Sequence, residues 1–95
     1  MNKTEAEKTL YDSRKKIDEI DEQIVNLILS RTALAQDIIS SKKALGMDLF
    51  DASREDIIHK KIKSMVEKEN VNTDKVLQIF DLLASISKEE QKKYL

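Results

Sequence analysis

The sequence contains no cysteine, no proline and a single glycine, Gly46, among its 95 residues. Without cysteine the chain can form no disulfide, no thiolate metal site and no thiol nucleophile, and the cytoplasm is the expected compartment. Because proline and glycine are the residues that most disfavour helices, their near absence favours long helices. Aromatic residues make up only 4% of the chain, which is not typical of a β-rich fold.

A strong charge of one sign is also missing, because the formal net charge is −1 although 37% of the residues are charged. A nucleic-acid binder would usually carry a basic excess, so no nucleic-acid partner is expected. No apolar run approaches the ~20 residues that span a bilayer, so no membrane partner is expected either. His59 is the only histidine, which excludes a multi-histidine metal site.

Helical periodicity dominates what is present. Apolar residues recur at three- and four-residue steps along the first half of the chain, at Ile17, Ile20, Ile24, Leu27, Leu34 and Ile38, with a gap after Leu27 that Arg31 fills. This spacing predicts one helix over residues 4–45, about 60 Å long, that ends at Gly46.

Two shorter helices are predicted in the second half. Ser53, followed by Asp56, resembles an N-cap and predicts a helix over residues 53–69. Asn72 or Thr73 caps a third helix over residues 73–94. The whole chain is predicted to form one all-α domain, residues 1–95.

The first helix is too long to bury its apolar stripe against two shorter helices of the same chain. An exposed apolar seam of that length predicts a partner, and the simplest partner is a second copy related by two-fold symmetry. We therefore expect an intertwined homodimeric helical bundle.

Cationic residues occupy positions on the apolar stripe of the first helix where apolar residues are expected. Arg31 and Lys42 fall near its centre, and an unpaired buried cation costs several kcal/mol, so each needs an anion nearby. They are ~16 Å apart along the axis and can meet one small anion between them. Arg14 lies ~42 Å from Lys42 on the same helix and can join that site only from the other chain of an antiparallel dimer.

Polar residues also continue the apolar face of the third helix, at Ser87 and Gln91. Arg54 and Glu55 open the second helix, next to Asp51 in the preceding loop. Taken singly, such residues usually reach solvent or set the register of a dimer seam. Their coincidence on several helices favours a site for a small ligand with carboxylates. The Lys88-Glu89-Glu90 run is interpreted as a solvated face, and His59 as lying near solvent.

These residues, in this order and spacing, resemble the AroQ-type helical chorismate mutases over nearly the whole chain. The resemblance rests on Arg14-Lys15-Lys16-Ile17-Asp18-Glu19-Ile20-Asp21, on Leu29-Ser30-Arg31 with Lys42, on the Asp51-Ala52-Ser53-Arg54-Glu55 loop, and on Ser87 and Gln91. Family members often carry proline in the connection before the second helix, where this chain has Asp48 and Ala52.

The resemblance implies an intertwined homodimer that rearranges chorismate to prephenate without a metal or cofactor. By match, Lys42 and Gln91 would be the catalytic pair at the breaking ether bond. Arg31, and Arg14 from the other subunit, would bind carboxylates. The remaining matched residues would bind the ring hydroxyl and complete the carboxylate contacts: Asp51, Glu55, Arg54 and Ser87.

Three other interpretations remain open at this point. The first is an isochorismate-pyruvate lyase, a relative with the same fold and a similar cationic site. The second is a non-catalytic regulatory or dimerisation domain of an aromatic-pathway enzyme. The third is a bare coiled coil without a ligand.

Overall fold

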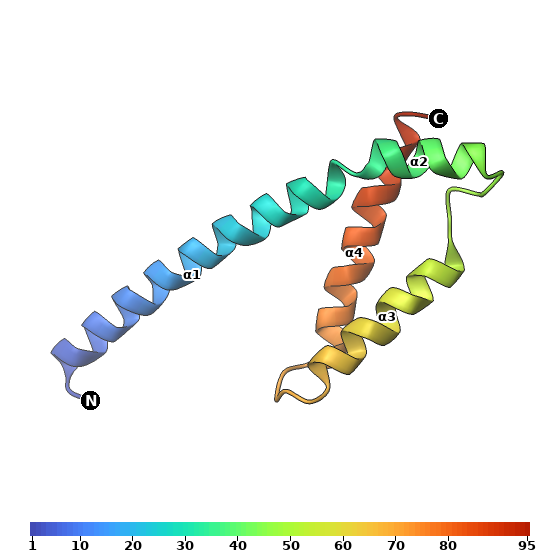
Figure 1. The fold of residues 1–95 in the computed structure, drawn as a ribbon. Helices are drawn as coiled ribbons and strands as arrows, with labels where there is room; N and C mark the ends of the chain where they lie inside the picture. The colour runs from blue at the N-terminus through green and yellow to red at the C-terminus, as the bar shows by residue number, and fades with distance from the viewer. The chain divides into compact units, whose positions relative to one another are not determined.

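The computed structural model describes residues 1–95, and its regular elements are all α-helices (Figure 1). They are α1 (Lys3–Thr32), α2 (Ala35–Ala44), α3 (Ala52–Val66) and α4 (Thr73–Lys92). The predicted all-α class with a long N-terminal helix is confirmed. The chain forms two compact units, Met1–Ser30 and Arg31–Leu95.

The first unit contains most of α1. Asn2 caps this helix, because its side chain accepts a hydrogen bond from the Glu5 backbone N–H at 2.8 Å. No residue of α1 is buried. Its apolar stripe is therefore largely exposed, at Leu10, Ile17, Ile20, Ile24 and Leu27. None of the four helices combines the length and hydropathy that a membrane span requires.

The prediction of one continuous helix over residues 4–45 is wrong, because the structure divides it at Ala33 and Leu34 into α1 and α2. The Leu34 N–H bonds to the Arg31 carbonyl, three residues back, at 3.2 Å, which is the tighter 3₁₀ pattern. The Ile38 N–H then bonds to the Leu34 carbonyl and restores the α-helical pattern. Leu34 keeps right-handed helical dihedral angles, and neither glycine nor proline marks the place in the sequence.

Gly46 ends α2 as predicted, in the left-handed conformation with φ of 68°. The Met47 N–H bonds to the Lys42 carbonyl at 2.8 Å and the Gly46 N–H to the Lys43 carbonyl at 3.2 Å. These two bonds form a Schellman motif, which satisfies carbonyls that the helix end would leave unpaired. The motif fixes the backbone of Lys42 at the last turn of α2.

The starts of α3 and α4 are set by side-chain caps. Asp51, not Ser53, caps α3, because its Oδ1 accepts from the Arg54 N–H at 3.0 Å, so the predicted cap is wrong by two residues. Asn72 caps α4 by accepting from the Lys75 N–H at 3.0 Å. This confirms one of the two predicted caps of that helix.

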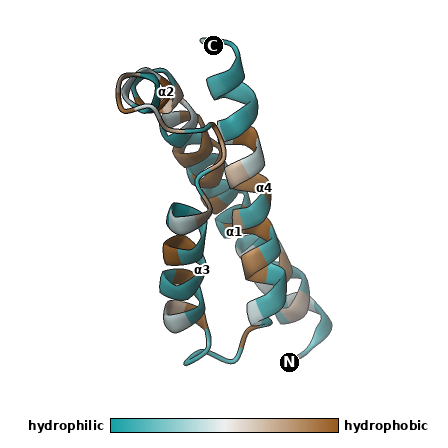
Figure 2. Cartoon of the chain, turned by 90° about the vertical axis from the view of Figure 1, so that its right-hand side faces the viewer, coloured by the Kyte–Doolittle hydropathy of each residue, from teal (hydrophilic) through white to brown (hydrophobic).

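The second unit is organised around α4, against which both α2 and α3 pack (Figure 1). Hydrophobic and hydrophilic residues alternate along α3 and α4, as expected for amphipathic helices (Figure 2). The buried apolar core of the second unit is small and comprises Ala35, Ile39 and Ile62, beside one buried polar residue, Gln91. The His59 ring nitrogen Nε2 lies 2.5 Å from Asp81 Oδ1 and links α3 to α4 near solvent.

Replacing Gly46 by alanine is predicted to lower the free energy of unfolding by about 1–2 kcal/mol, because a β-carbon is disfavoured in the left-handed conformation. A β-carbon at this position would meet nothing within 4 Å, so the penalty comes from the backbone. Gly46→Asn is the matched control and should lose less, since asparagine tolerates this conformation. Urea denaturation at one fixed chain concentration measures both, and equal losses would contradict the explanation.

Candidate functional site

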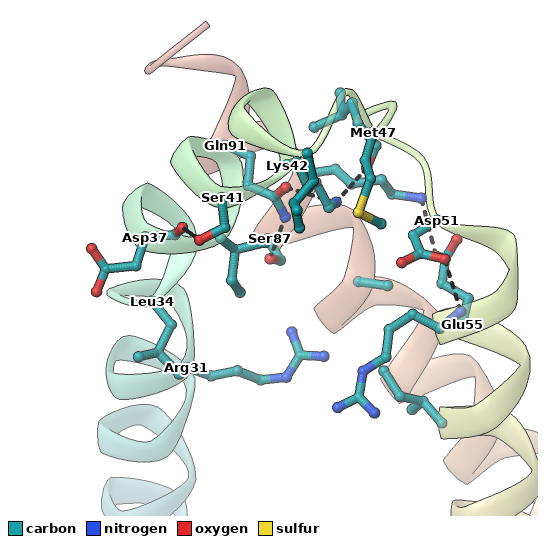
Figure 3. A pocket seen from close by; sticks show the side chains of 17 residues that line it. Arg31, Leu34, Asp37, Ser41, Lys42, Met47, Asp51, Glu55, Ser87 and Gln91 are labelled. Carbon is teal, nitrogen blue, oxygen red and sulfur yellow. Dashed lines mark hydrogen bonds and ion pairs between the residues drawn. The ribbon is translucent and has the colours of Figure 1, made fainter.

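A cavity of about 580 Å³ lies in the second unit, between α2, α3 and α4 (Figure 3). It brings together seven of the eight predicted site residues, all except Arg14. These are Arg31, Lys42, Asp51, Arg54, Glu55, Ser87 and Gln91. The rest of the lining is largely apolar and includes Leu34, Ile38, Leu45, Met47, Leu49, Ile58 and Ala84. Such a wall with a few converging polar groups is typical of a small-molecule site.

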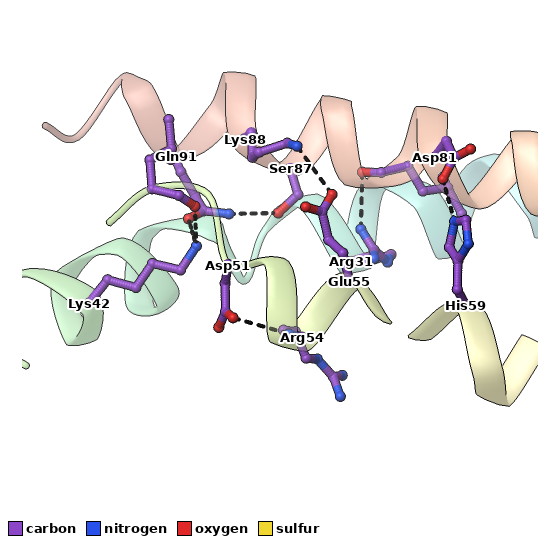
Figure 4. Close-up of polar contacts among 12 residues, drawn as sticks. Arg31, Lys42, Asp51, Arg54, Glu55, His59, Asp81, Ser87, Lys88 and Gln91 are labelled. Atoms are coloured by element: carbon purple, nitrogen blue, oxygen red, sulfur yellow. Dashed lines mark hydrogen bonds and ion pairs between the residues drawn. The ribbon is translucent and has the colours of Figure 1, made fainter. Parts of the chain in front are cut away.

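A chain of hydrogen bonds joins the last turn of α2 to the C-terminal half of α4 (Figure 4). Lys42 Nζ donates to Gln91 Oε1 at 2.9 Å and to the Leu49 carbonyl at 2.6 Å. Gln91 Nε2 donates to Ser87 Oγ at 3.0 Å. Ser87 and Gln91 are four residues apart on α4, so they share one face of that helix. Gln91 is only 3% exposed.

The orientation of the Gln91 amide follows from the chemistry of its neighbours. An ammonium has only donors, so the amide must turn its oxygen toward Lys42 and its nitrogen toward Ser87. The hydrogen bonds to Leu49 and Gln91 leave one N–H on Lys42, and the bond to Ser87 leaves one on Gln91. Both residues line the cavity. The pair can therefore donate two hydrogen bonds to one acceptor atom of a ligand.

Arg31 extends its guanidinium from the end of α1 into the cavity (Figure 3). Its Nη1 donates to the Leu83 carbonyl of α4 at 3.1 Å. That single bond fixes the direction of the side chain and leaves further N–H groups that can bind a carboxylate in the forked geometry typical of arginine.

Two acidic residues of the cavity, Asp51 and Glu55, have different roles. Asp51 starts α3 by accepting from the Arg54 backbone N–H, and thereby places Glu55 on the first turn of that helix. Glu55 Oε1 accepts from Lys88 Nζ at 3.1 Å, whereas Glu55 Oε2 is buried without a hydrogen-bond partner. A buried acceptor without a hydrogen-bond donor costs free energy, so we expect a ligand to donate a hydrogen bond to Oε2. Arg54 lines the cavity and is exposed.

The sequence interpretation missed three polar residues that line the cavity, Asp37, Ser41 and Lys88, and Lys88 is the one that pairs with a predicted site residue. It was assigned to a solvated face with Glu89 and Glu90, but it lines the cavity and its side chain is only 31% exposed. The signal was present in the spacing, because Ala84, Ser87, Lys88 and Gln91 recur at the three- and four-residue steps of one helix face.

Arg14 does not line the cavity of the second unit. It is an exposed residue of α1, in the unit Met1–Ser30. Its predicted part in the site therefore remains a prediction about a second chain.

Comparison with known proteins gives consistent matches. Residues 13–92 match the family model described as chorismate mutase type II. A chorismate mutase of Methanocaldococcus jannaschii is 40% identical over 86 residues, which cover 90% of this chain and 87% of that protein. A bifunctional chorismate mutase/prephenate dehydratase of Buchnera aphidicola subsp. Schizaphis graminum is 34% identical over 86 residues, 90% of this chain but 22% of that protein.

Among solved structures, a conserved hypothetical protein from Pyrococcus furiosus matches with a TM-score of 0.69 and 31% sequence identity. The match covers 87% of this chain and 95% of the other. Because the family model spans most of the chain and the archaeal relative matches along most of its own length, this chain belongs to the type II chorismate mutase family.

Proposed function

We propose that this chain is a chorismate mutase, an isomerase that rearranges chorismate to prephenate in the cavity between α2, α3 and α4. The observation that carries the proposal is the Lys42–Gln91 pair, whose hydrogen bond orients two donors beside one cavity. The family membership and the naming of the archaeal relative as a chorismate mutase support the same conclusion.

The reaction is unimolecular, so the protein needs no nucleophile. In the Claisen rearrangement the C–O bond of the ether breaks while a C–C bond forms, and partial negative charge develops on the ether oxygen. Donors fixed in advance around that oxygen stabilise the transition state more than the ground state. Lys42 and Gln91 supply one N–H each for this purpose.

The cavity must also hold the substrate in the compact, chair-like conformer in which the reacting atoms meet, which is an orientation effect. Arg31 is directed to bind one substrate carboxylate, with its guanidinium held by the Leu83 carbonyl. Ser87 and Arg54 complete the carboxylate contacts. The buried Oε2 of Glu55 is the acceptor for the ring hydroxyl of the substrate, and Asp51 supports it by starting α3.

We further propose that the functional form is an intertwined homodimer in which Arg14 of one chain binds a carboxylate in the cavity of the other. The support is the apolar stripe of α1, which is exposed although its residues are hydrophobic, with Leu27 69% and Ile17 54% exposed. The buried apolar core of one chain is also small. A second copy is the simplest partner that covers such a stripe.

The proposal is tested by incubating the purified chain with chorismate and, separately, with isochorismate. We expect chorismate to be consumed with formation of prephenate. Release of pyruvate from isochorismate, with chorismate left intact, would instead identify an isochorismate-pyruvate lyase. Binding of aromatic-pathway compounds without turnover would identify a regulatory domain.

Lys42→Ala is predicted to lower kcat by about 10²–10³-fold, the usual loss when one donor to a developing oxyanion is removed. Lys43→Ala, at the neighbouring exposed lysine, is the matched control and should retain near-normal kcat. Steady-state kinetics on chorismate measures both, with circular dichroism as a check of the fold. Normal turnover by the Lys42 variant would remove this residue from the mechanism.

Gln91→Glu is predicted to make the rate depend on pH. A carboxyl group can donate to the ether oxygen only when protonated, and glutamate ordinarily titrates at about pH 4.3. The variant should therefore be slow at pH 7.5 and gain rate as the pH falls toward 5. The unmodified chain keeps its amide donor throughout, so its rate should not collapse between pH 5 and pH 8. A flat profile for the variant would argue against Gln91 as a donor.

Mixing two inactive variants tests the shared site. Arg14→Ala and Lys42→Ala each damage every site of their own dimers, whereas a mixed dimer has one site with both residues intact. After unfolding and refolding together in equal amounts, statistical pairing should restore about a quarter of normal activity. If the mixture is no more active than its components, Arg14 does not act across the dimer.

A further inference from the structure

Lys88 and Glu55 form an ion pair across the cavity that the mechanism above does not use (Figure 4). Lys88 projects from α4 and Glu55 from α3, and Lys88 Nζ lies 3.1 Å from Glu55 Oε1. The two side chains are 31% and 29% exposed, so the pair is partly withdrawn from solvent. Both residues line the cavity, next to Ser87 and Gln91.

A second contact holds the ammonium in place. Lys88 Nζ lies 4.9 Å from the centre of the Phe50 ring, which is within the range of a cation–π interaction. Phe50 belongs to the connection between α2 and α3, one residue before the cap Asp51. Lys88 therefore links α4 to both the start of α3 and the connection that precedes it.

The ion pair gives the two carboxylate oxygens of Glu55 different roles. Oε1 is occupied by Lys88, and Oε2 is buried without a partner. A carboxylate without Lys88 could rotate and present either oxygen, or turn toward solvent.

We propose that Lys88 is a positioning residue that holds Glu55 so that Oε2 accepts a hydrogen bond from the ring hydroxyl of the substrate. This inference rests on the proposed function. Lys88 acts through Glu55 and does not bind the substrate itself. Its effect is therefore specific to substrates that carry the hydroxyl.

The position of the hydroxyl predicts which kinetic constant responds. The hydroxyl is on the ring carbon next to the one that bears the ether, but its own C–O bond neither forms nor breaks in the rearrangement. Its hydrogen bond is therefore made in the bound substrate and in the transition state alike. Loss of an interaction common to both states raises KM and leaves kcat nearly unchanged. This pattern separates Lys88 from Lys42, whose loss lowers kcat.

Three variants test the role. Lys88→Met removes the ammonium but keeps an unbranched side chain, and we expect KM for chorismate to rise about tenfold with kcat within about threefold, as for a lost charge-assisted hydrogen bond. Lys88→Arg keeps the charge and should recover most of the affinity. Lys92→Met, one turn further along α4 and exposed, is the matched control and should behave like the unmodified chain.

A substrate analogue without the ring hydroxyl, 4-deoxychorismate, gives the sharpest result. We expect kcat/KM for this analogue to be the same in the unmodified chain and in Lys88→Met, because the affected contact is absent. Equal losses on both substrates would show that Lys88 binds a carboxylate directly or only supports the fold, and would overturn the proposal. Unchanged kinetics of Lys88→Met on chorismate would overturn it as well.

The outcome for the unmodified chain keeps the two proposals apart. If that chain does not turn over chorismate, the proposed function fails and the role of Lys88 fails with it. If it turns over chorismate and the Lys88 variants do not show the expected pattern, only the role of Lys88 is wrong.

Discussion

The hydrogen bond between the Lys42 ammonium and the Gln91 amide oxygen, 2.9 Å long, is the contact on which the site depends. It joins the last turn of α2 to α4 and gives the buried glutamine one orientation, since lysine can only donate. Everything that sets Lys42 in place therefore acts on the site. The Schellman motif at Gly46 fixes its backbone, and the Leu49 carbonyl binds its ammonium.

The same principle of fixing polar groups before the ligand arrives extends around the cavity. Arg31 is held by a backbone carbonyl of α4, Glu55 by Lys88, and the start of α3 by Asp51. The first two contacts bind Arg31 and Glu55 to residues of α4. The third sets the start of α3, a helix that packs on α4. A catalyst that works by orientation and electrostatics needs this rigidity, because mobile donors would have to reorganise as charge develops.

The single chain buries little apolar surface, with three buried apolar residues and an uncovered stripe along α1. A stripe of this kind is costly in water. In the proposed dimer a partner chain would cover it and would also provide the route by which Arg14 reaches a cavity. In the proposed dimer, stability and the completion of the site would therefore have the same physical cause.

The sequence alone determined the helical class, the end of α2 at Gly46 and the set of polar residues that converge, because glycine conformation and helical periodicity are local properties. It assigned seven of the cavity's polar residues. Four of them interrupt the apolar stripes of predicted helices, and the other three belong to the Asp51–Glu55 segment that resembles the family's loop. Only the tertiary structure decided the break at Ala33 and Leu34, the cap at Asp51 and the pairing of Lys88 with Glu55. Those features depend on which groups of different elements approach one another, and spacing along one helix carries no information about the distance to the next.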